Sequence, residues 1–297
     1  TGAAPERVWN EVRRLVSGEG AIEGLALADR LGILAAVLPE LADLHGVVQS
    51  RYHHLDVYDH TLEVLARVIE LTASPERSFD PRDAERLRAV LDEPLGDGLT
   101  RAQGLRFGAL LHDIGKPGTR AVRPDGRVTF IGHDSEGARM VAALCARLRV
   151  SGGVRELLAG IASHHLVLGF LVHDRPLDRR AVYRYLRRCA PVEVEVTLLS
   201  CADRLATRGA NAEAGIASHL ELARELMGAA LDWREQGGPP SLPLRGDELA
   251  HELGIDPGPE LGELIEELRE AVYAGEVSEA EEVVAAARAL RLARAPR

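Results

Sequence analysis

Apolar residues recur at steps of three and four along most of the chain, the spacing that places them on one face of a helix. The clearest stripes predict core helices at 59–71 and 105–111, with His60 in the first turn of the former. Further helices are predicted at 6–16, 22–37, 82–91, 135–149, 154–165, 179–189 and 192–208. The helix over 22–37 should stop at Pro39. The pattern therefore indicates an all-α protein.

Strand signals are confined to one short segment. Pro124, Asp125 and Gly126 separate the stretches 120–123 and 127–131, which predicts a small β-hairpin and the only strands of the protein. The alternation at 192–196 could be mistaken for a strand, but it lies within a longer helical pattern. We therefore expect helices to carry the core.

Proline and glycine divide the chain. The run 237–241, Gly-Gly-Pro-Pro-Ser, is the best linker candidate, and three helices are expected beyond it. The middle one should start after Pro257-Gly258-Pro259, and Ser278 with Glu281 has the spacing of a capping box for the last. The predicted organisation is a helical lead-in at 1–41, a large domain at 42–235 and a C-terminal helical domain at 243–297.

Composition supports helices and limits the partners. Aromatic residues make up only 4% of the chain, which disfavours strands, and the net charge of −10 disfavours nonspecific binding of polyanions over the whole surface. Two arginine clusters, 179–188 and 139–155, are interpreted as solvated helix faces rather than as RNA-binding patches.

The cysteines and the hydropathy bear on location. The cysteines are odd in number and lack C-x-x-C spacing, which indicates a reducing compartment. No signal peptide is apparent, and the most apolar stretch, 157–172, is interrupted by Ser163, His164 and His165. We expect a cytoplasmic protein that is not in a membrane. Because the sequence begins at Thr1, it leaves open whether residues precede it.

Candidate chemistry gathers at helix ends. His112 and Asp113 precede the stop signals Gly115 and Pro117, so the pair should lie at a helix terminus. The other inward-facing polar residues beside apolar stripes are His60, His133, His164, His165 and Asp203. Imidazole and carboxylate without thiolate suit a hydrolytic centre of Mn, Fe, Ni, Co or Mg rather than structural zinc. Such an ion lowers the pKa of bound water and offsets charge on a phosphoryl oxygen.

The order and local sequence of these residues resemble a known family. His60, then His112-Asp113 within Leu-Leu-His-Asp-Ile-Gly-Lys, then Asp203 within Ala-Asp-Arg, match the H…HD…D pattern of the HD-domain phosphohydrolases. The resemblance implies an all-α HD-domain core in which these four residues bind a divalent metal. His133 and His164 match the additional positions of members that hold a second ion, so the resemblance implies one or two ions per chain.

More narrowly, nearly the whole chain resembles the C-terminal portion of bacterial tRNA nucleotidyltransferases and related poly(A) polymerases. The similarity lies at 32–41, 254–259 and 274–276. It implies hydrolysis of phosphomonoesters or 2′,3′-cyclic phosphodiesters, and a possible tRNA partner. The nucleotidyltransferase head, however, needs a Gly-Gly turn with Arg-Asp and a nearby pair of aspartates. Ser151 to Glu156 imitates that turn only superficially, and we interpret it as a helix start.

The hypothesis that follows is a metal-dependent phosphohydrolase acting on a nucleotide or RNA-end phosphate. The predicted metal ligands are His60, His112, Asp113, Asp203, His133 and His164. Lys116 should act as a point charge on the phosphate, with Arg120 and His165 also binding substrate; His165 could replace His164 as a ligand. Asp113, Lys116, His133 and His164 are the predicted catalytic residues. The alternative is an RNA-binding body and tail of a tRNA nucleotidyltransferase whose catalytic head is absent.

The remaining histidines are treated separately. His45, His173, His219 and His251 are expected to be structural. For His53 and His54, which precede the first core helix and could line the mouth of the site, the structural and functional interpretations both stay open. The sequence does not predict an oligomeric state.

Overall fold

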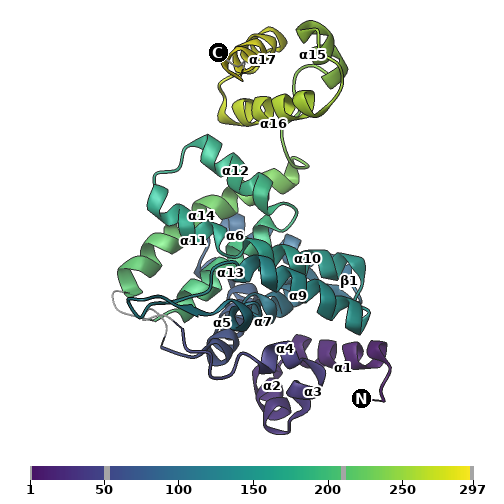
Figure 1. Cartoon of the computed structure of the whole chain (residues 1–297), viewed down its shortest axis with the longest axis vertical. Coiled ribbons are helices and arrows are strands. Elements are labelled where there is room, and N and C mark those ends of the chain that lie inside the picture. The colour runs from purple at the N-terminus through teal and green to yellow at the C-terminus, as the bar shows by residue number, and fades with distance from the viewer. Residues whose placement is uncertain (1, 50–53, 209–211, 295–297) are drawn as a thin grey trace. The chain divides into compact units, whose positions relative to one another are not determined.

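The computed structural model describes residues 2–49, 54–208 and 212–294 (Figure 1). Contacts between Cα atoms divide the chain into two compact units. The first comprises Thr1–His173 and Pro191–Leu231, and the second comprises Asp174–Ala190 and Asp232–Arg297. Helices form nearly all the regular structure of both units, so the predicted all-α class is confirmed. The domain boundaries proposed from the sequence stay a prediction, and the contact division differs in assigning 174–190 to the C-terminal unit.

The first unit holds the lead-in and the predicted core helices. Its longer helices are α1 (Pro5–Ser17), α2 (Ala21–Arg30), α5 (Val57–Ala73), α6 (Pro81–Leu91), α7 (Arg101–Leu111), α9 (His133–Leu148), α10 (Gly152–His164), α13 (Glu193–Ala206) and most of α14 (Ala212–Glu235). Its short helical turns are α3 (Ile33–Val37), α4 (Pro39–Ala42), α8 (Lys116–Thr119), α11 (Val167–Leu171), η1 (Pro75–Arg77) and η2 (Val172–Asp174). Helix α5 packs against α7 and α13, and α10 packs against α7 and α9. Five helices thus converge around one core.

Two small antiparallel pairs are the strands of the described chain. The predicted hairpin is present as β3 (Ala121–Val122) and β4 (Val128–Thr129). A second pair, β1 (Pro94–Gly96) and β2 (Leu99–Thr100), was not predicted. The expectation that the hairpin holds the only strands is therefore wrong.

The C-terminal unit has its own apolar core. It comprises α12 (Arg179–Cys189), the end of α14, α15 (Gly246–Leu253), α16 (Pro259–Ala274) and α17 (Ala280–Arg294). Leu249, Leu268 and Val283 are fully buried where α15, α16 and α17 meet. The three predicted C-terminal helices and the start of α16 at Pro259 are confirmed.

Several sequence predictions need correction. The predicted helix over 22–37 is broken between Arg30 and Ile33, because Gly32 has a φ of 69°, in the left-handed region that ends helices. Pro39 starts α4 instead of stopping a helix, since proline fits the first helical position. Helix α14 was missed. The cap of α17 is made by Glu282, whose carboxylate accepts the backbone N–H groups of Ser278 and Glu279, and not by Glu281.

One stretch of the chain, Gly152–Asp174, is long and apolar enough to cross a membrane, judged by length and composition alone. A single such stretch is weak evidence, because core helices pass the same test. Here it forms α10, α11 and η2, and α10 packs between α7 and α9.

Candidate metal centre

The candidate ligands come from the ends of helices that pack together in the first unit. His60 lies in the first turn of α5, which Asp56 caps by accepting the backbone N–H of Asp59. His112 is the C-cap of α7, and His133 is the first residue of α9. His165 is the C-cap of α10, and Asp203 lies near the end of α13. Distant sequence segments thus meet at one place.

Asp113 is the centre of this cluster. Its side chain is 2% exposed, and its Oδ2 lies 3.1 Å from Nε2 of His112 and 2.6 Å from Nζ of Lys116. Its Oδ1 lies 3.4 Å from Nε2 of His133 and 3.7 Å from Nε2 of His165. A carboxylate this deeply buried needs compensating positive charge or hydrogen bonds. Here both oxygens face nitrogen atoms.

Three of the histidines are oriented in the same way. In each, Nδ1 lies within hydrogen-bonding distance of the backbone carbonyl three residues earlier: His112 to Ala109 at 2.8 Å, His133 to Phe130 at 2.7 Å and His165 to Ala162 at 2.9 Å. A carbonyl only accepts, so Nδ1 carries the proton and the lone pair of the neutral ring is on Nε2. The Nε2 atoms point to Asp113. This is the arrangement by which proteins orient metal-ligating imidazoles.

His60 and Asp203 form the other side of the cluster. His60 Nε2 lies 2.9 Å from Asp203 Oδ1, and the imidazoles of His60 and His112 have centroids 6.2 Å apart. The His60 side chain is 2% exposed, whereas that of Asp203 is 33% exposed, so the cluster reaches the surface at Asp203. All four residues of the H…HD…D pattern are thus brought together.

Electrostatics keep both carboxylates ionised. Burial raises the pKa of Asp113, but the charges of His112 and Lys116 lower it by more. The pKa of Asp113 therefore lies well below its usual range. Burial likewise raises the pKa of Asp203, and the hydrogen bond and charge of His60 reverse the shift to a lowered value. Burial and the neighbouring His112 lower the pKa of His165 to about 4, so that ring is neutral at pH 7. Burial lowers the pKa of His112, but Asp113 reverses the shift to a raised value. Anionic carboxylate and neutral imidazole are the forms that bind cations, so an ion bound at His112 would displace its proton.

The donor set fits a divalent ion. Ligand atoms of His60, His112 and Asp113 lie within 4.8 Å of one another, and so do those of Asp113, His133 and His165. The two groups share Asp113. The buried Nε2 of His112 lies 3.1 Å from Asp113 Oδ2 but outside hydrogen-bond geometry, so the lone pair of the neutral ring is available to a cation. The described residues can therefore hold one ion, or two with Asp113 between them.

Comparison with known proteins defines the family. The HD domain family matches residues 57–208, which contain His60, the His112-Asp113 pair and Asp203. The chain belongs to the HD domain family. A second family, described as "Probable RNA and SrmB- binding site of polymerase A", matches residues 1–44.

Relatives of this HD-domain chain are tRNA nucleotidyltransferases. It is 34% identical over 279 residues to the A-adding tRNA nucleotidyltransferase of Deinococcus radiodurans, covering 93% of the chain and 56% of the relative. It is 34% identical over 281 residues to the CC-adding tRNA nucleotidyltransferase of Thermus thermophilus, covering 94% and 55%. A multifunctional CCA protein of an Acidovorax species is 30% identical over 270 residues, covering 89% and 53%. The chain thus spans about half the length of the curated relatives it matches.

Within the HD domain, the geometry differs from the sequence prediction at one ligand. His165, and not His164, joins Asp113 and His133 in the second donor group. Both histidines continue the buried stripe of α10, by steps of three and four from Ile161, so spacing alone cannot separate them. The choice of His164 as a ligand stays a prediction, and this geometry favours His165 in its place.

The predicted phosphate-binding residues occupy different environments. Lys116 is buried, and its Nζ contacts Asp113 and Oε1 of Gln49, at 2.8 Å, and lies 5.5 Å from the centroid of the Phe130 ring. Neither Gln49 nor Phe130 was predicted, because no spacing rule singles out residues between helices. Arg120 is exposed on the segment that follows α8.

The other described histidines belong to neither donor group. His45 lies 3.1 Å from Asp29 and stacks on Tyr58, and His219 is buried with its Nε2 3.0 Å from the Ser200 hydroxyl. His54 is exposed, as is His251. His53 lies outside the described residues.

Close backbone packing beside the HD pair leads to a prediction for Gly115. A Cβ atom there would lie 2.2 Å from the carbonyl oxygen of His133 and 2.6 Å from the backbone nitrogen of Gly137. Because backbone atoms cannot rotate away, Gly115→Ala should displace the start of α9 and destabilise the protein by about 3 kcal/mol. Urea unfolding tests this. Gly118→Ala, with open space around its Cβ, is the matched control and should change stability by less than about 1 kcal/mol.

The buried His219 predicts a loss of stability in acid. Burial lowers its pKa from 6.5 to about 4, and Arg204 contributes in the same direction. The unfolded chain therefore takes up this proton at a higher pH than the folded chain. The stabilisation is fully present above pH 6.5 and is lost as the pH falls towards 4. Between pH 7 and 5, the wild type should lose roughly 2 kcal/mol more than His219→Gln. Urea unfolding at pH 7 and pH 5 measures the free energy of unfolding of both proteins. An equal loss in the wild type and in His219→Gln would contradict this prediction.

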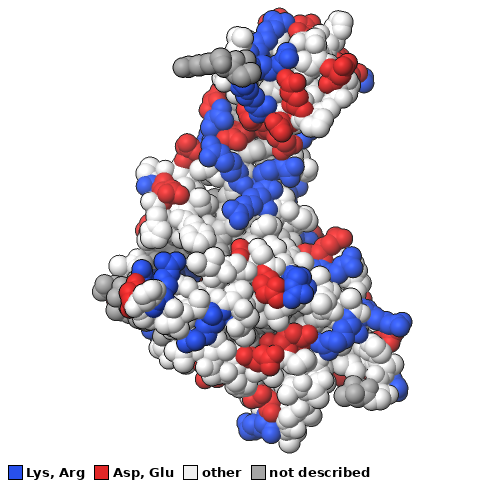
Figure 2. All heavy atoms as spheres, viewed as in Figure 1, with Lys and Arg blue, Asp and Glu red and all other residues white. Residues whose placement is uncertain are grey.

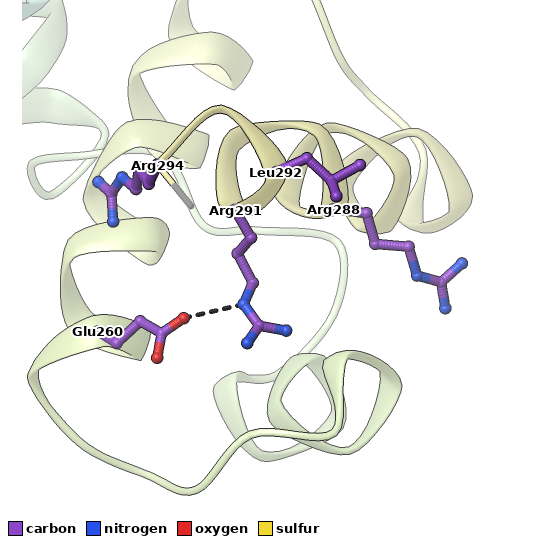
Figure 3. A pocket seen from close by; sticks show the side chains of 5 residues that line it. All are labelled: Glu260, Arg288, Arg291, Leu292 and Arg294. Atoms are coloured by element: carbon purple, nitrogen blue, oxygen red, sulfur yellow. Dashed lines mark hydrogen bonds and ion pairs between the residues drawn. The ribbon is translucent and has the colours of Figure 1, made fainter. Parts of the chain in front are cut away.

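A separate hollow lies on the C-terminal unit. Its volume is about 740 Å³, and Figure 3 shows its lining residues Glu260, Arg288, Arg291, Leu292 and Arg294. The arginines are ion-paired: Arg291 lies 2.8 Å from Glu260, and Arg294 3.4 Å from Glu263. Acidic and basic side chains lie beside one another over this unit (Figure 2). These pairs hold α17 against α16 and leave little net charge for an anion.

The arginine cluster at 179–188 is also largely ion-paired. Arg180 pairs with Glu270 and Glu276, and Arg187 pairs with Glu266, so the cluster joins α12 to α16 within the C-terminal unit. Arg184 and Arg187 remain 64% and 52% exposed, so the interpretation as a solvated face stands, with ion pairs to α16 that the sequence did not predict.

Proposed function

We propose that this chain is the HD-domain and tRNA-binding part of a protein of the tRNA nucleotidyltransferase type. The similarity to A-adding and CC-adding enzymes along more than nine tenths of the chain supports this proposal most strongly. The match of residues 1–44 to an RNA-binding family supports it independently. The 297 residues of this chain lack the Gly-Gly, Arg-Asp and paired-aspartate set of a nucleotidyltransferase head. We therefore assign tRNA binding, and not nucleotide addition, to this part.

Binding of tRNA tests this proposal. Fluorescence anisotropy should show binding of a labelled tRNA that weakens steeply between 50 and 200 mM KCl, because released counterions drive such binding. A DNA duplex of similar length should bind more weakly, since the net charge of −10 opposes binding by charge alone. No tRNA binding at low salt, or equal binding of the duplex, would contradict the proposal.

The convergence of three oriented imidazoles on a buried carboxylate favours a second activity. We propose that the same chain hydrolyses a phosphate ester at the Asp113 centre, with a nucleotide or RNA end as substrate. The ligands would be His60, His112, Asp113 and Asp203 for one ion, and Asp113, His133 and His165 for a second. A divalent ion held there supplies Lewis-acid stabilisation of phosphoryl charge and a more acidic water.

The residues of the chain have separate tasks in this proposal. Lys116 carries an ammonium group fixed by Asp113 and Gln49, with one N–H left for a phosphate oxygen. His133 and His165 have Nε2 atoms 3.1 Å apart, and His165 stays neutral at pH 7 because of its lowered pKa. Asp203 is the most exposed residue of the cluster, and substrate would approach from its side.

Hydrolysis assays test the second activity directly. Nucleoside 3′- and 5′-monophosphates and 2′,3′-cyclic nucleotides should be assayed with Mn²⁺, Ni²⁺ or Mg²⁺, and with EDTA as the control. The proposal predicts release of product from at least one ester, abolished by EDTA. No turnover of any of them with any of the ions would contradict it, and would leave the tRNA proposal intact.

A further inference from the structure

The β3–β4 hairpin is joined at both ends to residues of the Asp113 centre. On one side, α8 begins at Lys116 and ends immediately before Arg120. On the other side, the Phe130 ring lies 5.5 Å from Lys116 Nζ, and the Phe130 carbonyl accepts from Nδ1 of His133. The hairpin therefore projects from the centre, and its strands are anchored where phosphate is proposed to bind.

The hairpin itself is short and well defined. Ala121 pairs with Thr129 and Val122 with Val128, and the tight turn has Gly126 at a φ of 80°. The whole of 120–127 is exposed. Burial within the unit therefore does not explain the composition of this segment.

Its exposed side chains are basic and apolar. The segment 120–131 carries three arginines against one aspartate, within a chain of net charge −10. Asp125 is paired with Arg127, at 2.6 Å. Arg120 and Arg123 form no ion pair with any described residue. Val122 is 57% exposed and Ile131 75% exposed.

We propose that this hairpin binds the RNA strand that leads into the Asp113 centre. Arg120 and Arg123 contact its phosphates, and the apolar surface of Val122 and Ile131 lies against its bases. Because α8 rises about 1.5 Å per residue and a strand about 3.3 Å, the Cα atoms of Arg120 and Arg123 lie within roughly 8 and 18 Å of that of Lys116, the reach of a few nucleotides. That the RNA strand leads into the Asp113 centre rests on the proposed hydrolytic function. Binding of RNA by the hairpin does not depend on that function. The substrate class is then an RNA end rather than a free nucleotide.

The test compares two double variants of equal charge change. Arg120→Gln/Arg123→Gln removes the unpaired arginines of the hairpin. The control, Arg77→Gln/Arg155→Gln, removes two exposed arginines of the same unit on η1 and near the start of α10. Two probes are used. A labelled ten-nucleotide RNA is titrated with each protein, once in the presence of Mn²⁺ and once in EDTA. A nucleoside monophosphate is the substrate for hydrolysis.

The hairpin variant should bind the ten-nucleotide RNA about 10-fold more weakly at 50 mM KCl, and the salt slope should fall by about 1.4, as expected for two lost phosphate contacts. The control variant should hydrolyse the monophosphate at the wild-type rate. The control should bind like the wild type. No RNA binding by the wild type, unchanged binding by the hairpin variant or an equal loss in the control overturns the inference. A binding loss without any hydrolysis by the wild type would support the hairpin and refute the hydrolytic proposal.

Discussion

Replacing Asp113 with asparagine is expected to abolish phosphate-ester hydrolysis, with a fall in rate of at least about 100-fold. The substitution keeps the size of the side chain and removes a charge that faces His112, Lys116 and His133 together. Without this charge, the donor groups that share Asp113 each lose their anionic member. Metal affinity should fall by a similar factor, since even residues behind the ligands contribute 10- to 100-fold.

The matched control is Asp134→Asn. Asp134 neighbours His133 in the first turn of α9, but it belongs to neither donor group. This variant should keep most of the wild-type activity. Circular dichroism and thermal unfolding in EDTA separate loss of the centre from loss of the fold. A folded Asp113→Asn variant with more than a tenth of the wild-type rate would refute the hydrolytic role.

Replacing Arg101 with alanine should destabilise the first unit by about 3–5 kcal/mol. Arg101, at the start of α7, lies 2.5 Å from Oε1 of Glu195 in α13, and the Glu195 side chain has no exposed surface. The substitution leaves a buried carboxylate without its cation, which costs more than the pair contributes. This ion pair lies at the ends of α7 and α13 opposite to the metal centre. The substitution should therefore lower the free energy of unfolding more than it lowers the metal affinity.

Urea unfolding measures this effect, and two variants make it specific. Arg139→Ala removes an exposed pair with Glu136 and should cost less than about 1 kcal/mol. The double variant Arg101→Met/Glu195→Leu should lose less stability than Arg101→Ala, because it removes both buried charges together. A loss of under 1 kcal/mol in Arg101→Ala would contradict the account of this pair.

Periodicity predicted the helices with strong apolar stripes, and it failed where the stripe was weak or interrupted. Helix α14 was missed, although its buried Ala223, Leu226, Met227 and Ala230 follow helical spacing. Small residues and glycines in that segment weaken the contrast between its faces. The break at Gly32 was missed for another reason: apolar residues on both sides continue the pattern, and only backbone conformation separates the two helices.

The candidate site was predictable where local sequence and order carry it. His60, the His112-Asp113 pair and Asp203 were named from the sequence, and they lie together in the structure. The choice between His164 and His165 was not predictable from spacing. His164 is the last residue of α10 and His165 is its C-cap, so the direction of each side chain depends on how the helix ends. Gln49 and Phe130 were not predictable either, since their contacts with Lys116 depend on how loops fold back.

Calorimetric titration of the EDTA-stripped protein with Mn²⁺ tests the central claim most directly. The account predicts that the wild type binds one or two ions per chain, and that replacing His112 with glutamine, which removes the buried Nε2 lone pair, lowers the affinity strongly. Failure of the wild type to bind Mn²⁺, Ni²⁺ or Mg²⁺, or unchanged binding in the His112→Gln variant, would contradict it.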